Sequence, residues 1–134
     1  MSRMPAGRPS GVGFLATGAV LAGLGVAAGS LGAHVLKDGF SARDSEIWDT
    51  AANYQMYHAL SLVVVARLLS RHPIRLFTAA CGLFTLGILL FSGSLYGLAI
   101  TGAKSFGLMT PLGGIFLLGG WGCLAVGIVR SNRS

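Results

Sequence analysis

Residues 76–103, LFTAACGLFTLGILLFSGSLYGLAITGA, carry no charged side chain. A helix rises about 1.5 Å per residue, so about 20 apolar residues cross the hydrocarbon layer of a membrane, and this stretch is long enough. Further uncharged stretches occur at residues 9–36, 50–66 and 105–129. Four such stretches in a chain of 134 residues predict an all-α integral membrane protein with four transmembrane helices.

The composition also points to a membrane protein. Hydrophobic residues make up 53% of the chain and charged residues only 10%, whereas a soluble domain has about 25% charged residues. The net charge is +6, but the basic residues lie at the ends of the uncharged stretches and form no separate basic tail or domain. We therefore expect the lipid bilayer as partner, with a second copy or a larger membrane complex as further partners, and no nucleic acid.

The placement of Lys and Arg predicts the orientation. Four spans would place both termini and the second loop on one side, and the first and third loops on the other. The first side has seven basic residues, namely Arg3, Arg8, Arg67, Arg71, Arg75, Arg130 and Arg133, and the other side has three, Lys37, Arg43 and Lys104. By the positive-inside rule both termini are expected in the cytoplasm, with the protein in the inner (plasma) membrane, or in the mitochondrial inner membrane of a eukaryote.

We expect one membrane domain over residues 1–134, with helices at about 11–36, 45–70, 74–100 and 111–129. The loops are short, so the helices should form an up-down antiparallel bundle. The first helix could instead be a cleaved signal peptide, because Ala27-Ala28-Gly29 offers small residues for cleavage. Its uncharged stretch is longer than the roughly 7–15 residues of a signal peptide, which favours a span.

Local signals predict where these helices begin and end. Ser41 and Asp44 resemble a capping box, so the second helix should begin outside the membrane and cross it over residues 51–69. Thr110 before Pro111 is typical of a helix start. A glycine at position 39 or 102 would suit a left-handed stop after the first or the third helix.

Small residues recur at a spacing of four within the predicted spans. This spacing lets helices approach closely in lipid, where the hydrophobic effect does not drive association. The residues expected to pack helices together are Gly25 and Gly29, followed by Ala33, then Gly93 and Gly97, and Gly119 and Gly127 with Cys123 between them. We expect these contacts within one chain, and an interface between copies is the alternative.

Polar side chains gather toward the predicted extracytoplasmic ends of the helices. The set consists of His34, Gln55, His58, Ser92, Ser94, Tyr96 and Thr110. Polar groups in a membrane must find partners, so the set is either a structural hydrogen-bond network or the site of a transporter or channel for a small solute or lipid. Trp48 and the tyrosines also fit an aromatic belt at the outer membrane surface.

His34 and His58 could together bind a metal ion or haem, with Asp38, Glu46 or Asp49 completing the site from the first loop. Two histidines on separate helices, with no third ligand close in sequence, are a weak signal for such a site. No Ser-His-Asp pattern, phosphate loop or zinc motif is present either. We therefore expect no enzymatic activity, no cofactor and no metal.

Four segments together resemble the family called domain of unknown function 423. They are GAH at 32–34, WDTAANYQMYHALSL at 48–62, LFSGSLYGLAITG at 90–102 and TPLGGIFLLGGW at 110–121. The family includes YgdD-like bacterial inner-membrane proteins and animal transmembrane protein 256, so the resemblance implies a small membrane protein of four helices. The family has no established activity. The main expectation is a non-enzymatic accessory or structural subunit of a membrane assembly.

Overall fold

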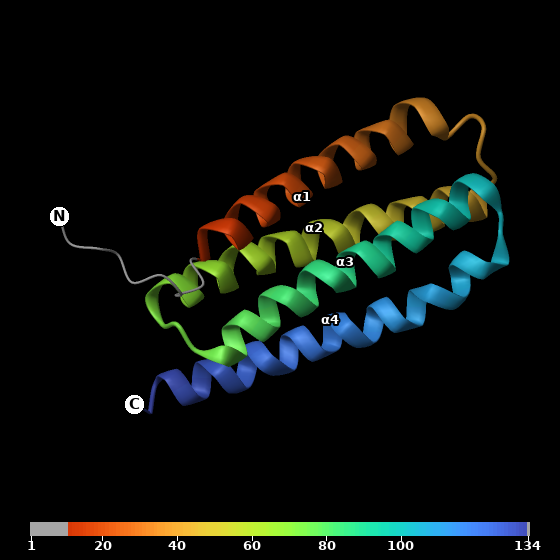
Figure 1. Ribbon diagram of the computed structural model, residues 1–134. Helices are drawn as coiled ribbons and strands as arrows, with labels where there is room; N and C mark the ends of the chain where they lie inside the picture. Colours follow the sequence, from red (N-terminus) through yellow and green to blue (C-terminus); the bar gives the residue numbers. More distant parts are fainter. Residues whose placement is uncertain (1–10, 134) are drawn as a thin grey trace.

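The computed structural model describes residues 11–133, so Arg3 and Arg8 lie outside the described residues. Within this range the chain is helical, as predicted. The elements are α1 (Gly11–Leu31), a single π-helical turn η1 (Gly32–Leu36), α2 (Ala42–Arg71), α3 (Arg75–Thr101) and α4 (Lys104–Ser131). Successive helices run in opposite directions and lie beside one another in chain order (Figure 1).

Three helical segments of the described chain are long and apolar enough to cross a membrane. They are Gly11–Leu36, Arg75–Thr101 and Lys104–Ser131. α2 is not among them, because the polar side chains Asn53, Gln55 and His58 lie within its uncharged stretch at residues 50–66 and lower the hydropathy there. A membrane-spanning α2 therefore stays a prediction.

The helices form a row and not a closed ring. α1 packs on α2, α2 on α3 and α3 on α4, whereas α1 contacts α3 only slightly. α1 and α4 lie at the two edges of the row (Figure 1). The apolar core, built around Leu62, Phe77 and Phe84, extends toward the α2–α3 loop. The buried polar side chains lie toward the opposite end of the row.

α4 packs closely on α3 through glycines spaced by seven residues. Seven residues are about two helical turns, so these glycines form one stripe along α4. Each faces a phenylalanine of α3, and the phenylalanines are also spaced by seven. The pairs are Gly113 with Phe91, Gly120 with Phe84, and Gly127 with Phe77. A Cβ atom on any of the three glycines would lie within 3 Å of its phenylalanine, so only glycine allows this approach.

A second glycine repeat of the same spacing joins α1 to α2. Its members are Gly11, Gly18, Gly25 and Gly32, and all four are buried. At the C-terminal end of the repeat, a Cβ on Gly32 would lie 2.7 Å from the Trp48 indole nitrogen. The spacing of seven therefore brings α2 side chains directly onto the α1 backbone.

The predicted spacing of four holds only in part. Gly25, Gly97, Gly119 and Gly127 contact a neighbouring helix. The prediction that Gly29 and Gly93 contact another helix of the same chain was wrong, because a Cβ at either position would meet nothing within 4 Å. These two glycines face open sides of the helix row.

The start of α4 was predicted wrongly at Thr110 and Pro111. α4 begins seven residues earlier, at Lys104, and Pro111 lies inside the helix. Tertiary packing accounts for the difference. The ring of Phe106, in the first turn of α4, lies against Gly97 of α3, where a Cβ would be 2.9 Å from the ring. This contact supports the two turns before Pro111, which removes only one backbone N–H donor.

Of the other predicted helix boundaries, the start of α2 and the end of α3 are confirmed, and the glycine stop predicted after the first helix is wrong. The Ser41 hydroxyl caps α2 by accepting a hydrogen bond from the Asp44 backbone N–H at 3.1 Å. Gly102 ends α3 in the left-handed region at a φ of 68°. Gly39 has no positive φ, because the π-helical turn η1 carries α1 into the loop by a different route.

Candidate functional site

Six of the seven predicted polar residues make hydrogen bonds inside the helix row. Gln55, His58, Ser92 and Ser94 are at most 6% exposed, and Tyr96 and Thr110 are half-buried. The seventh, His34, lies exposed on η1 and does not join them. The structure therefore brings together six of the predicted residues in three separate groups.

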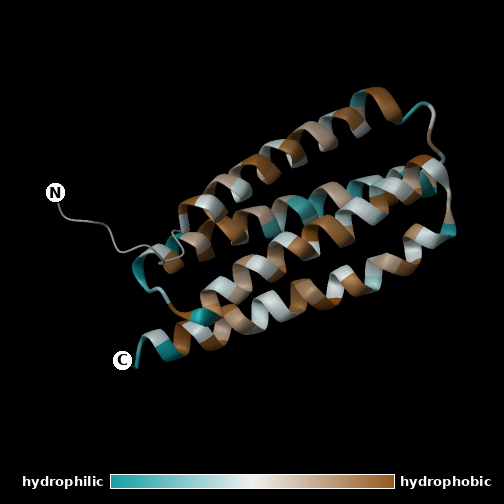
Figure 2. Ribbon diagram, in the orientation of Figure 1, coloured by the Kyte–Doolittle hydropathy of each residue, from teal (hydrophilic) through white to brown (hydrophobic). Residues whose placement is uncertain are grey.

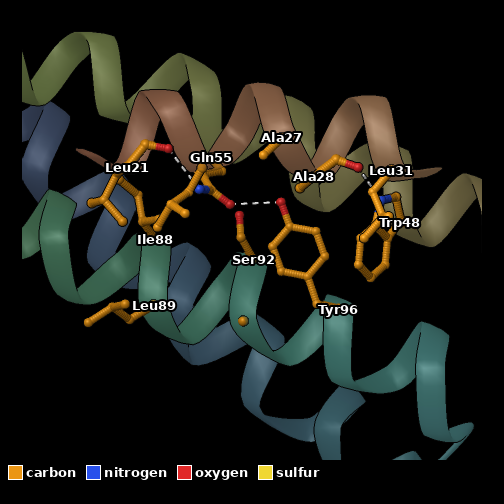
Figure 3. Close-up of a pocket in the computed structure, with 12 residues that line it drawn as sticks. Leu21, Ala27, Ala28, Leu31, Trp48, Gln55, Ile88, Leu89, Ser92 and Tyr96 are labelled. Carbon is orange, nitrogen blue, oxygen red and sulfur yellow. Dashed lines mark hydrogen bonds between the residues drawn. The ribbon is translucent and has the colours of Figure 1, made fainter. Parts of the chain in front are cut away.

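Gln55 of α2 links three helices. Its Nε2 donates to the Leu21 carbonyl of α1 at 2.8 Å, and its Oε1 accepts from the Tyr96 hydroxyl of α3 at 2.7 Å (Figure 3). The orientation of the amide follows from its partners, because a backbone carbonyl can only accept. This one side chain fixes the positions of both neighbouring helices relative to α2.

Two further bonds strengthen the same end of the row. Ser92 of α3 donates to the Ala51 carbonyl of α2 at 2.8 Å. Trp48 of α2 donates from its indole nitrogen to the Ala28 carbonyl of α1 at 2.7 Å, and its ring lies 4.6 Å from that of Tyr96 (Figure 3). Trp48 is only 6% exposed, so its ring packs between helices and does not face lipid as a belt residue would.

His58 bonds through both ring nitrogens. Nδ1 lies 2.7 Å from the Tyr54 carbonyl, and Nε2 lies 3.1 Å from the Trp121 indole nitrogen of α4. A carbonyl accepts and an indole N–H donates, so Nδ1 carries the proton and Nε2 is the acceptor. These two partners favour one tautomer of His58, and the bond to Trp121 ties α2 to α4 across the face of α3.

Sequence reasoning gave Trp121 no role. A signal was available, because Trp121 lies ten residues before the end of α4 and far from its start, in the interior of an apolar helix. An indole N–H at such a depth needs an acceptor. The partner itself depends on the tertiary structure.

The third group joins α3 to α4. The hydroxyls of Ser94 and Thr110 share a hydrogen bond of 2.7 Å, and Ser94 also bonds the Phe91 carbonyl at 2.9 Å. Thr110 therefore serves as a link between helices and not as a helix cap.

These hydrogen bonds engage the polar side chains of the interior. Among residues 11–133, every buried side-chain nitrogen and oxygen has a hydrogen-bond partner. The described residues also include no cluster of three His, Cys, Asp or Glu side chains suited to a metal ion. Both nitrogens of His58 are engaged, so His58 and the distant His34 do not form the shared metal or haem site considered from the sequence.

An apolar groove lies beside the Gln55 group, between α1 and α3. Its volume is about 590 Å³, and its walls include Leu31 and Leu89 (Figure 3). Leu24 and Gly93 also line it. Gln55, Ser92 and Tyr96 also line it, but their side chains are already hydrogen-bonded within the chain, Gln55 and Tyr96 to each other. A smaller hollow of about 480 Å³ lies between α2 and α4 next to His58 and Trp121.

Long apolar helices, tied by hydrogen bonds between buried polar side chains, define an α-helical integral membrane protein. A family model described as "Protein of unknown function (DUF423)" matches residues 28–114, and the chain belongs to this family.

Curated relatives agree with that assignment. The chain is 41% identical over 118 residues to the UPF0382 membrane protein YwdK of Bacillus subtilis, covering 87% of this chain and 96% of the relative. It is 39% identical over 117 residues to a UPF0382 membrane protein of Staphylococcus epidermidis, covering 87% and 95%. It is 36% identical over 108 residues to the UPF0382 inner membrane protein YgdD of Escherichia coli K12, covering 81% and 82%. No solved structure matches the chain.

Proposed function

We propose that all four long helices cross the membrane, with both termini in the cytoplasm. α2 packs against α1 on one side and α3 on the other, and both of these neighbours are long and apolar enough to span. A central helix presents less surface to lipid, so it needs less apolar character than its neighbours. The charges of α2 lie near its two ends, and Gln55 and His58 in its middle are buried and hydrogen-bonded within the chain, so these two side chains do not face lipid.

Cysteine accessibility tests this topology. Asp38→Cys places a thiol in the first loop and His72→Cys places one in the second, in a background that lacks the two native cysteines. If α2 spans, an impermeant maleimide added to intact cells labels only the first variant, and the second is labelled after permeabilisation. Equal labelling of both loops from one side contradicts the proposal.

For the biochemical role, we propose a non-enzymatic accessory or structural subunit of a membrane assembly. The observation that carries this proposal is the commitment of the buried polar side chains to hydrogen bonds within the chain. A site that acts on substrate needs donors or acceptors that are free to change partner. The described interior holds instead a set of clamps between helices.

Open faces of the row offer contact surface for such an assembly. Leu24 and Val20 of α1 and Leu118 of α4 are 55–72% exposed. Gly29, on α1, has open space at its Cβ position. Small residues of this kind allow another helix to approach closely in lipid.

Purification in mild detergent at native expression tests the subunit proposal. We expect the protein to co-purify with other membrane proteins, and recovery should fall for Gly29→Leu, whose new side chain meets nothing within the chain. Gly82→Leu adds the same side chain at an open position of α3, away from α1, and is the matched control: its recovery should be unchanged if α1 supplies the contact. A clean monomer for the wild type contradicts the proposal.

The groove between α1 and α3 favours a second candidate, the binding of a lipid or small apolar solute for transport. Its polar wall residues are already bonded, so an occupant would have to be apolar. Gly93→Phe should fill the groove and change the lipids that co-purify, as measured by mass spectrometry, while Gly82→Phe should not. An unchanged lipid profile for Gly93→Phe contradicts this candidate.

A further inference from the structure

A polar hollow lies where α1, the first loop and α2 meet. Its volume is about 310 Å³, and its walls include Ala33, Lys37, Phe40, Ser45, Trp48 and Asp49. We call it the loop hollow. Figure 2 shows hydrophilic residues, in teal, at this end of α2 and in the adjoining loop. The hollow adjoins the end of the apolar segment Gly11–Leu36, which is long and apolar enough to cross a membrane, so we expect the hollow at the membrane surface.

The polar groups of the loop hollow differ from those of the interior because they are uncommitted. Within residues 11–133, the side chains of Lys37, Ser45 and Asp49 make no hydrogen bond or ion pair. Lys37 and Asp49 line one hollow and yet do not pair with each other. The hollow therefore offers a positive and a negative group at separate positions.

The surrounding charge narrows the class of ligand. The segment from residue 37 to residue 49 carries four acidic residues, Asp38, Asp44, Glu46 and Asp49, and two basic residues, Lys37 and Arg43, which gives a net charge of 2 − 4 = −2. A purely anionic group is repelled by this excess of acid. A group that carries a cation beside its anion complements both Lys37 and Asp49.

We propose that the loop hollow binds the headgroup of a phospholipid that carries a primary amine, such as a phosphoethanolamine lipid. Lys37 binds the phosphate as a positive charge. The ammonium group donates hydrogen bonds to the Asp49 carboxylate and the Ser45 hydroxyl, and the rings of Phe40 and Trp48 border it, as aromatic rings do for ammonium groups. A choline headgroup lacks the N–H donors, and a glycerol headgroup lacks the cation.

The acyl chains have a path away from the hollow. Ala33 lines the hollow, and Gly29 lies one helical turn deeper along α1 with open space at its Cβ position. The face of α1 at Gly29 is therefore open to an acyl chain below the headgroup. The contacts proposed for the headgroup do not depend on how the protein is oriented in the membrane. Only the expectation that the hollow faces the outer leaflet rests on the proposed topology.

Native mass spectrometry of the full chain in detergent tests the proposal. The protein is titrated with phosphatidylethanolamine, phosphatidylcholine and phosphatidylglycerol of identical acyl chains. We expect phosphatidylethanolamine to bind tightest, and Asp49→Asn should weaken its binding by at least about tenfold, because one charge-assisted hydrogen bond is lost. Lys37→Gln should weaken phosphatidylethanolamine and phosphatidylcholine alike, since both carry the phosphate.

Matched variants supply the controls. Glu46→Gln makes the same charge change as Asp49→Asn, and Arg43→Gln the same as Lys37→Gln, but neither residue lines the hollow. Both should leave the preference for phosphatidylethanolamine intact. Equal binding of the three lipids by the wild type overturns the proposal, as does an equal effect of Glu46→Gln and Asp49→Asn.

A competition experiment distinguishes a membrane lipid from a free solute as the occupant of the loop hollow. Soluble O-phosphoethanolamine has the same charged groups without acyl chains. We expect it to displace the lipid only at concentrations at least about a hundredfold above those of the lipid, because it lacks the contacts along α1. Displacement at equal concentration overturns a membrane lipid as the occupant. Cysteine labelling tests the topology independently of these binding results.

Discussion

Replacing Gly113 by alanine tests whether the glycine repeat sets the distance between α3 and α4. A Cβ at this position would lie 2.7 Å from the Phe91 Cα and 2.8 Å from its Cβ. Carbon atoms pack comfortably at about 3.5–4.0 Å, so the two helices would have to separate by roughly 1 Å at this point. Overpacking of this kind costs about 1–3 kcal/mol.

The neighbouring glycine provides the control. A Cβ on Gly114 would lie 3.8 Å from the Phe91 ring, which is an ordinary contact. Both substitutions gain the same helix propensity of about 1 kcal/mol on an aqueous scale, so this gain cancels when the two variants are compared. We expect Gly113→Ala to be less stable than Gly114→Ala by the overpacking cost alone, about 1–3 kcal/mol.

Unfolding by SDS in mixed micelles measures the difference. Helix content gives one signal, and tryptophan fluorescence gives a second, because the Trp121 ring on α4 lies 5.2 Å from that of Phe84 on α3. Stabilities of Gly113→Ala and Gly114→Ala that agree within about 0.5 kcal/mol refute the reasoning, since a surface substitution has effects of that size.

Three further substitutions test the clamps and the second glycine repeat by the same unfolding measurement. Gln55→Leu removes two hydrogen bonds and leaves the Tyr96 hydroxyl unpaired, so we expect a loss of about 1–3 kcal/mol, against a smaller loss for Tyr96→Phe. Trp121→Phe should cost about 0.6–1.7 kcal/mol beyond packing, and this extra cost should be absent when the substitution is made in a His58→Phe background, as a double-mutant cycle measures. Gly18→Ala should destabilise the α1–α2 contact, because the new Cβ lies 3.1 Å from a backbone carbonyl of α2, and unchanged stability would contradict the role of the repeat.

Local signals predicted much of the fold. The uncharged stretches gave the positions of the helices, and Ser41 and Gly102 marked a start and a stop where the structure has them. The signal at Thr110 and Pro111 failed because Phe106 packs on Gly97 and extends α4 across the proline. A contact between two helices therefore overrode a local preference.

The candidate site was predicted as a set of residue types and not as an arrangement. Polarity within apolar helices singled out Gln55 and His58 as side chains that need partners. Their partners include the Leu21 carbonyl and the Trp121 indole, which lie 34 and 63 residues away in the chain. No spacing rule links such distant positions, so sequence reasoning included His34 in the cluster and left Trp121 out.

The sequence by itself determined that this is a helical membrane protein, because charge and hydropathy are properties of each stretch alone. It also determined that glycines line the helices, but not which glycines touch a neighbour. Only the tertiary structure decided that a spacing of seven sets the contacts and that Gln55 and His58 act as clamps. Those outcomes depend on which helices meet and in what register, and register is a property of pairs of helices.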